Sequence, residues 1–161
     1  ESYTQKTFSP QRYEIWTMQS AWHNLPTFDG VQQLPGAEYA AREVCTDKNS
    51  ITGELAGAYP PIPGLTTYRR CVSVGDQGIA LRDETDYPGI VELTLLTEQK
   101  PVPTADGFAV GTLGGIRFDP DAATAAVTPV PITDPRLRTA WPETIYKITL
   151  HFQKTLNLEL Y

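Results

Sequence analysis

The chain contains two histidines, His23 and His151, so few arrangements of a nucleophile with a histidine base, or of several histidines on a metal, are available to it. His23 lies in the run Ser-Ala-Trp-His-Asn-Leu-Pro, between a strand-like stretch and an Asp-Gly turn. Taken alone, it is interpreted as a polar side chain that hydrogen-bonds within a turn. His151 falls in an alternating run on the face opposite Ile148 and Leu150, which predicts an exposed strand histidine.

Familiar chemical motifs are missing from the sequence. It contains no phosphate-binding loop, no dinucleotide-binding glycine motif, no nucleophile elbow and no HExxH zinc motif, so most enzyme classes lose support. Cys45 and Cys71 lack the paired spacing of a zinc knuckle, and each is expected as a small buried side chain in a strand. A disulfide bond between them across neighbouring strands is the alternative.

Arginines are the candidate groups for binding acidic sugars, because a guanidinium pairs with a carboxylate through two hydrogen bonds. Arg69 and Arg70 are neighbours in one predicted strand, so they point to opposite faces of the sheet. The one that points inward is expected to pair with a carboxylate such as Asp83 or Glu84. Arg12 and Arg82 complete this set.

The elements that position these residues are predicted to be short strands. Large apolar residues fall on alternate positions in residues 13–18 and 146–152, as half-buried strands require. Turn residues separate further candidates. These candidate strands span residues 39–46, 51–58, 67–74, 78–84, 90–97, 108–110, 114–118, 122–127 and 156–161. Residues 128–135 contain three prolines and predict an extended surface crossing.

About ten or more short strands, without a long helical pattern, predict an all-β fold, namely an antiparallel β-sandwich. A single domain over residues 1–161 is expected, because a chain of 161 residues suits one core. The net charge of −6 disfavours nucleic acid and anionic membranes as partners. No apolar run approaches the roughly 20 residues that cross a bilayer. The N-terminal residues do not form a signal peptide, so the localisation is unknown from the sequence.

Several segments occur in an order that resembles a known family. Residues 12–44, RYEIWTMQSAWHNLPTFDGVQQLPGAEYAAREV, contain a His-Asn pair followed by Asp-Gly-x-x-Gln. The sequences Ala-Gly-Ala-Tyr-Pro at 56–60, Tyr-Arg-Arg-Cys-Val at 68–72 and Ile-Ala-Leu-Arg-Asp at 79–83 follow. Over roughly residues 3–83, this succession resembles the C-terminal β-domain of the heparinase II/III family of polysaccharide lyases.

The resemblance implies a helical toroid followed by a β-sandwich, with the site in the cleft between them. These enzymes cleave uronate-containing glycans by β-elimination: a base removes the proton α to the carboxylate, and an acid, often tyrosine, protonates the leaving oxygen. By the same resemblance, His23 is a ligand of a zinc ion in the sandwich, and Asn24 and Gln33 lie close to the substrate. Hydrogen bonding in turns and at strand edges is the alternative role for Asn24 and Gln33.

The sequence departs from the family pattern. In the family, the other zinc ligands and the sandwich histidine come from an upstream His-x-Asp strand and a following Asp-x-Gly strand, and neither motif occurs before Glu1. The chain therefore resembles the last part of the β-domain, without the toroid. One histidine cannot hold zinc, since structural sites need about four ligands and catalytic sites about three. In the isolated chain we expect no catalytic residue, no lyase activity and no bound zinc. The implied partners are the helical domain of the same chain and an acidic polysaccharide, with zinc in the complete protein.

Two other functions stay open. A carbohydrate-binding module would stack exposed aromatic rings on sugars, with Trp16, Trp22, Trp141 and Tyr68 as candidates. A structural or adhesive sandwich that binds protein would need neither a glycan nor a site at His23. The lyase-domain interpretation instead predicts an exposed apolar face where the helical domain docks.

Overall fold

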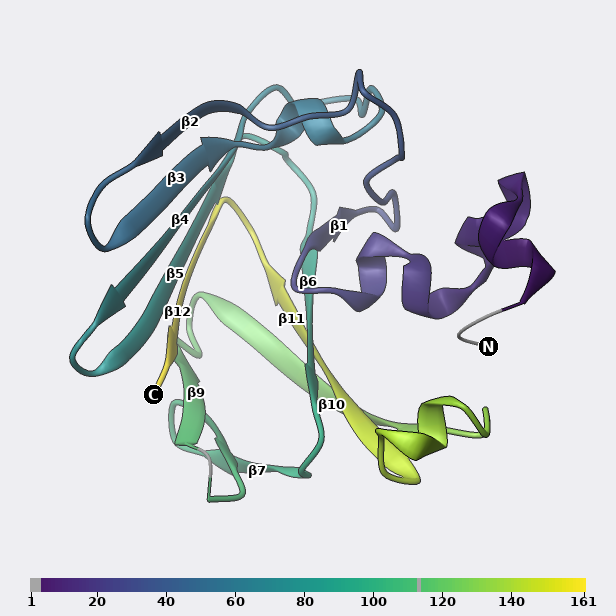
Figure 1. Cartoon of the computed structure of the whole chain (residues 1–161). Coiled ribbons are helices and arrows are strands. Elements are labelled where there is room, and N and C mark those ends of the chain that lie inside the picture. The colour runs from purple at the N-terminus through teal and green to yellow at the C-terminus, as the bar shows by residue number, and fades with distance from the viewer. Residues whose placement is uncertain (1–3, 113) are drawn as a thin grey trace.

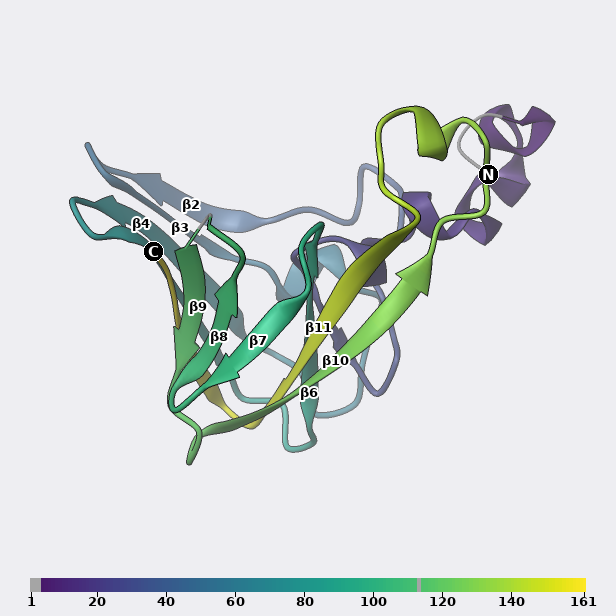
Figure 2. The ribbon, with the colours of Figure 1, turned by 90° about the horizontal axis from the view of Figure 1, so that it is seen from below.

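The computed structural model describes residues 4–112 and 114–161. Over these residues the chain forms twelve β-strands and six short 3-10 helices, which confirms the predicted all-β fold. The strands make two antiparallel sheets that face each other as a sandwich, and the N-terminal helices lie to one side (Figures 1 and 2). None of the helices in the described residues has the length and hydropathy to cross a membrane.

The two sheets differ in size. The four-stranded sheet has the order β1 (Pro26–Phe28), β6 (Val91–Thr97), β11 (Thr144–Phe152) and β10 (Ala123–Pro131). The eight-stranded sheet has the order β2 (Arg42–Thr46), β3 (Ser50–Glu54), β4 (Tyr68–Gly75), β5 (Gly78–Thr85), β12 (Thr155–Leu160), β9 (Gly114–Phe118), β8 (Gly107–Val110) and β7 (Pro101–Thr104). Residues 153–154 connect β11 to β12, so this turn carries the chain from one sheet to the other.

Alternating apolar side chains of both sheets meet in the core. Ile148, Leu150 and Phe152 on β11 are at most 2% exposed, and Leu156 and Leu158 on β12 are each 1% exposed. Burying each of these side chains contributes about 1.5–3 kcal/mol, so the β11–β12 connection is among the most strongly stabilised parts of the fold.

An aromatic cluster lies at the end of the core beside β1. The Phe28 ring is fully buried, and its centroid lies 5.0 Å from that of Tyr59, 5.5 Å from Tyr68 and 5.3 Å from Tyr87. All three pairs are edge-to-face, the arrangement that the charge distribution of aromatic rings favours. This cluster joins β1, β4 and the loops after β3 and β5.

The predicted strand over residues 13–18 is wrong. This region forms consecutive 3-10 helices: η1 (Gln5–Phe8), η2 (Pro10–Glu14), η3 (Trp16–Met18) and η4 (Ser20–Trp22). Ser9 caps η2 by accepting a hydrogen bond from the Gln11 backbone N–H, and Pro10 occupies the first helical position. Backbone N–H groups such as that of Met18 donate to the carbonyl three residues earlier, so they do not pair with a neighbouring strand.

Smaller differences concern strand ends. Strands β1 and β7 were not predicted, and the strand predicted over 51–58 ends at Glu54, before η5 (Ala56–Ala58). The predicted crossing over 128–135 begins as part of β10, and a loop with η6 (Leu137–Thr139) follows. Strand β10 is an edge strand, where Pro129 and Pro131 are tolerated because their missing N–H groups need no partner on the outer side. The remaining predicted strands are confirmed with shifted ends.

The two cysteines are free, and the alternative of a disulfide bond between them is wrong. Both Cys45 on β2 and Cys71 on β4 pair with Thr52 on the strand between them. Two strand spacings separate them, about 9–10 Å, which exceeds the Cα separation that a disulfide spans. The expectation that both are buried is also incorrect, since Cys45 is exposed and Cys71 is half-buried.

Candidate functional site

The segments that carry the family resemblance meet at the buried side chain of Arg70. Arg70 lies on β4 directly opposite Asp83 on β5, and both side chains point to the inner face of the eight-stranded sheet. Its Nε donates to Asp83 Oδ1 and its Nη2 to Asp83 Oδ2, both at 2.6 Å. Its Nη1 donates to the backbone carbonyl of Asn24, in the turn that links η4 to β1.

This ion pair confirms the prediction that the inward arginine pairs with a carboxylate. The Asp83 side chain is fully buried and that of Arg70 is 11% exposed. Burial alone would lower the pKa of the Arg70 guanidinium, but its hydrogen bonding to Asp83, together with the electrostatic influence of Tyr68, Asp83 and Tyr59, raises this pKa above its ordinary value. The Arg70 guanidinium therefore stays charged in the folded protein.

Two buried tyrosines surround the pair. The Tyr59 hydroxyl donates to the Pro26 carbonyl at 2.7 Å, which ties the end of the Ala-Tyr-Pro segment to β1. Within the described residues, the Tyr68 hydroxyl has no hydrogen bond of normal length and angle. Burial raises the pKa of both hydroxyls, and the nearby Asp83 charge raises that of Tyr68 further. These groups are neutral at physiological pH.

The histidine turn is also joined to the Asp-Gly-x-x-Gln segment. The backbone N–H of Gln33 donates to Ser20 Oγ at 3.0 Å, and the N–H of Ala21 donates to Gln32 Oε1 at 3.1 Å. The segment before the His-Asn pair and the end of the Asp-Gly-x-x-Gln segment therefore lie side by side in the fold.

His23 ends η4, and its imidazole is exposed. Its Nε2 lies 3.2 Å from the Thr17 carbonyl oxygen, so this nitrogen carries the proton in that contact. In residues 4–112 and 114–161, no three His, Cys, Asp or Glu side chains come together as metal ligands. The described residues thus form no zinc site around His23, and its role as a zinc ligand stays a prediction that needs further ligands.

Asn24 and Gln33 do not share one pocket. Asn24 lines a cavity of about 240 Å³ with Thr97, Leu160 and Tyr161, where β6 approaches the ends of β9 and β12. Gln33 lines a different cavity, of about 500 Å³, beside the N-terminal helices. The role of each near a substrate remains a prediction.

The other arginines of the candidate set lie outside this network. Arg69 is on the outer face of β4, where its Nη2 is 2.7 Å from Glu43 Oε2, and Arg82 pairs with Glu84 at 2.7 Å. Arg12 lies with its guanidinium 6.0 Å from the centre of the Tyr13 ring. The predicted opposite orientation of Arg69 and Arg70 is confirmed.

The three tryptophans form a cluster between the N-terminal helices and the loop before β11. The ring centroids of Trp16 and Trp22 are 4.7 Å apart, and those of Trp16 and Trp141 are 5.9 Å apart. All three side chains are half-buried. Tyr68, the fourth ring proposed to stack on sugars, is fully buried and cannot do so.

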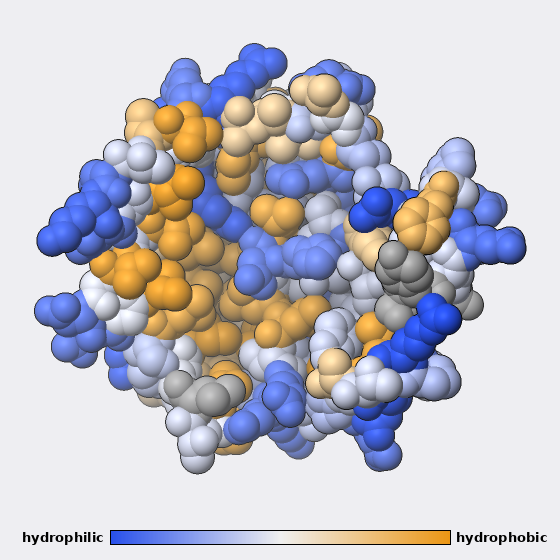
Figure 3. All heavy atoms as spheres, viewed as in Figure 1, coloured by the Kyte–Doolittle hydropathy of each residue, from blue (hydrophilic) through white to orange (hydrophobic). Residues whose placement is uncertain are grey.

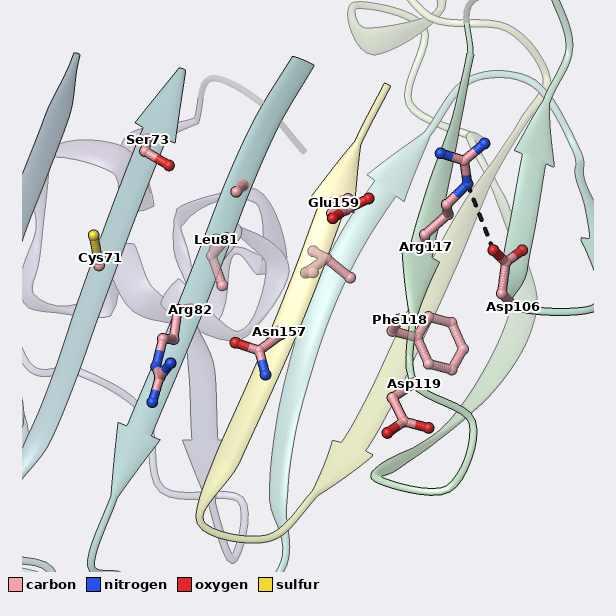
Figure 4. Close-up of a pocket in the computed structure, with 12 residues that line it drawn as sticks. Cys71, Ser73, Leu81, Arg82, Asp106, Arg117, Phe118, Asp119, Asn157 and Glu159 are labelled. Carbon is pink, nitrogen blue, oxygen red and sulfur yellow. Dashed lines mark ion pairs between the residues drawn. The ribbon is translucent and has the colours of Figure 1, made fainter. Parts of the chain in front are cut away.

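A depression that sequence reasoning missed lies on the outer face of the eight-stranded sheet (Figure 4). Its volume is about 620 Å³, and Arg82, Asn157 and Arg117 contribute to its lining. Arg117 Nε is 3.5 Å from Asp106 Oδ2, and Arg82 pairs with Glu84. The sequence gives one signal for this depression, namely the alternation along β5 and β12, which places Arg82 and Asn157 on one face. The position of β9 beside β12, which adds Arg117, cannot be predicted from the sequence.

An exposed apolar face lies at the other side of the same sheet. Ile51 pairs with Val72, and Val74 pairs with Ile79, on the inner face next to the core. The exposed fractions are 48% for Ile51, 57% for Val74 and 39% for Ile79. Figure 3 shows apolar side chains gathered beside the hollow between the sheets. The four-stranded sheet leaves this part of the inner face uncovered.

Comparison with known proteins does not assign a family. No protein-family model matches the chain, and no curated protein has a significantly similar sequence. The resemblance to the lyase β-domain therefore rests on the sequence motifs and stays a prediction.

Proposed function

We propose that this sandwich is the C-terminal β-domain of a heparinase II/III-like polysaccharide lyase. In this proposal the domain packs against a helical domain and completes a cleft in which uronate-containing glycans are cleaved by β-elimination. One observation carries the proposal: the segments of the resemblance contact one another around Arg70, although Asn24 and Arg70 are 46 positions apart in the chain.

The chemistry divides between the two proposed domains. Removal of the proton α to a uronate carboxylate requires that the carboxylate charge be stabilised by donors aimed at it. Arg69, Arg70 and Arg82 each pair with a carboxylate of this chain. We therefore assign the base, the acid and the stabilising donors to the helical domain. The part of this chain is to hold the His23–Asn24 turn in a fixed place.

The exposed apolar face supports docking of another domain. Val74 and Ile79 would lose their contact with water when a helical domain covers them, which favours association. The net charge of −6 repels a polyanionic glycan, so the attraction for substrate would also come from the helical domain.

The experiment that tests this function is a lyase assay of the complete protein. Each of several uronate-containing glycans, with a neutral glucan as control, is incubated with the protein while the ultraviolet absorbance of the unsaturated uronate product is followed. We expect absorbance to rise with at least one uronate glycan and not with the glucan. Absence of product from every uronate glycan would overturn the proposal.

His23 provides a prediction of its own in the complete protein. If it ligates zinc together with residues outside this sequence, His23→Ala lowers both the bound zinc and the melting temperature, because metal binding is coupled to folding. Elemental analysis and a thermal melt give the two quantities. His151→Ala is the matched control, since His151 lies on β11 and contacts Glu92 instead. Equal zinc contents in the two variants contradict the assignment.

A carbohydrate-binding module is the second candidate, favoured by the cluster of all three tryptophans. Partly exposed indole rings on one surface can stack on sugar rings. Affinity electrophoresis of this chain alone, on gels with uronate and neutral glycans, separates the candidates. A binding module is retarded without any other domain, whereas the lyase β-domain is not.

A further inference from the structure

We infer that Arg70 is a positioning residue for the His23–Asn24 turn: the Asp83 carboxylate fixes its guanidinium, and the guanidinium fixes the turn through the Asn24 carbonyl. The meaning of this turn for catalysis rests on the proposed function. The mechanical role of Arg70 does not, because it depends on contacts within this chain.

The guanidinium is fixed to the sheet before it reaches the turn. Arg70 and Asp83 are direct cross-strand partners on β4 and β5, two strands of eight residues that pair along their full length. The bidentate contact aligns the plane of the guanidinium with the carboxylate. The directions of the N–H donors on Nη1 are therefore fixed, and the Asn24 carbonyl accepts from one of them.

The turn lies between segments that other contacts hold: Gln33 donates to Ser20 before it, and Phe28 is fully buried after it. It follows the three-residue helix η4 and precedes β1, an edge strand of three residues. Short 3-10 turns and short edge strands contribute little stability of their own. A hydrogen bond from a charged, nearly buried donor is about twice as strong as one between neutral groups. Arg70 thus restrains the Asn24 carbonyl directly, and His23 through the backbone beside it.

A purely structural role for the ion pair is the competing explanation. Replacing a buried ion pair by apolar side chains of similar size often leaves stability unchanged or raises it, whereas removing one partner is strongly destabilising. The double variant Arg70→Met/Asp83→Leu therefore removes the donor to Asn24 without leaving a buried charge. The single variant Arg70→Lys retains the charge opposite Asp83 but loses the planar fork that reaches two acceptors at once.

The test measures amide hydrogen exchange, residue by residue, in this chain without glycan or metal. In both variants we expect exchange at the His23 and Leu25 amides to rise about tenfold or more, the factor for losing a charged hydrogen bond. Amides of β11 should keep their protection, because β11 lies in the other sheet and pairs with β6 and β10. Arg69→Met is the matched control, since it removes the neighbouring arginine from the outer face.

The outcomes separate the two explanations. Unchanged exchange at His23 and Leu25 in a folded variant overturns the positioning role and leaves a structural ion pair. If the double variant does not fold, Arg70→Lys decides the matter in the same experiment. In the complete protein, Arg70→Lys should lower kcat more than it raises KM. A wild-type protein without lyase activity would contradict the proposed function, while the exchange result would stand by itself.

Discussion

A buried ion pair is most sensitive to the loss of one partner, because the other charge then lies in a low-dielectric interior without compensation. Asp83 is such a partner, since its side chain is fully buried and accepts two hydrogen bonds from Arg70. The neighbouring pair between Arg69 and Glu43 has a similar distance, 2.7 Å, but both side chains are exposed. Both are arginine–carboxylate pairs, so comparing them shows the effect of burial on the stability that such a pair contributes.

Asp83→Asn should therefore lower the free energy of unfolding by about 3–5 kcal/mol. Glu43→Gln, the control, should change it by about 1 kcal/mol at most, because solvent screens an exposed pair. Urea unfolding followed by tryptophan fluorescence measures both values. A loss for Asp83→Asn no larger than that of the control would show that the inner pair contributes no more than a surface contact.

The buried tyrosines predict the behaviour at high pH. Burial raises the pKa of the Tyr59 and Tyr68 hydroxyls in the folded protein, whereas an unfolded tyrosine titrates near about pH 10. Above this pH the unfolded chain loses protons that the folded chain keeps, so stability that is fully present below about pH 10 falls as the pH rises. Urea unfolding at a series of pH values should show this loss.

Tyr68→Phe should make that alkaline loss smaller, because it removes one group whose pKa differs between the two states. At neutral pH it should cost little, since the hydroxyl has no normal hydrogen bond to lose. Tyr13→Phe, at a ring that is 44% exposed, is the control. The same pH slope in Tyr68→Phe and the wild type would show that this hydroxyl ionises as freely in the fold as in water.

At the scale of elements, the N-terminal helices depend on side-chain contacts rather than on a sheet. Trp16 contacts Trp141 across the gap to the loop before β11, and Ala21 and Gln33 donate to side chains of the other segment. Consecutive 3-10 helices have poor hydrogen-bond geometry and little stability of their own. The attachment of this segment to the sandwich therefore rests on side-chain contacts such as these.

Trp141→Ala should loosen the N-terminal helices without unfolding the sandwich. One aromatic contact contributes about 0.5–1.5 kcal/mol, so limited trypsin cleavage after Arg12 should become about two- to tenfold faster. Mass spectrometry of the fragments measures the rate at that bond. Val102→Ala, at an exposed residue of β7, is the control. An unchanged rate would show that the tryptophan contact does not hold the segment.

Alternation located most strands because a half-buried strand has a period of two, and β4, β5, β11 and β12 each show it. The same pattern failed at residues 13–18, where the capping residue Ser9 and Pro10 start a run of 3-10 turns. The pairing of the inward arginine with Asp83 was predictable, because strand alternation shows that one of two neighbouring arginines points inward, where it requires a carboxylate partner. The contact of Arg70 with Asn24 was not, since it depends on how the two sheets are placed relative to each other.

At the scale of the whole molecule, the sandwich combines protected sheet edges with an open apolar face. Edge strand β10 contains Pro129 and Pro131, β7 begins with Pro101, and β2 carries charged side chains and a bulge. Such edges resist pairing with other strands. Association with another body is therefore expected at the apolar inner face of β3–β5, where Ile51, Val74 and Ile79 are exposed.

The most direct test of the central claim is a complementation assay. This chain and the helical domain proposed to precede it are prepared separately, and unsaturated uronate product is measured for each part and for their mixture. We predict that neither part alone is active and that the mixture forms product, with less product after Val74→Asp on the apolar face. A helical domain that is fully active alone, or a mixture that stays inactive while the complete protein is active, would contradict the claim that this sandwich completes the cleft by docking.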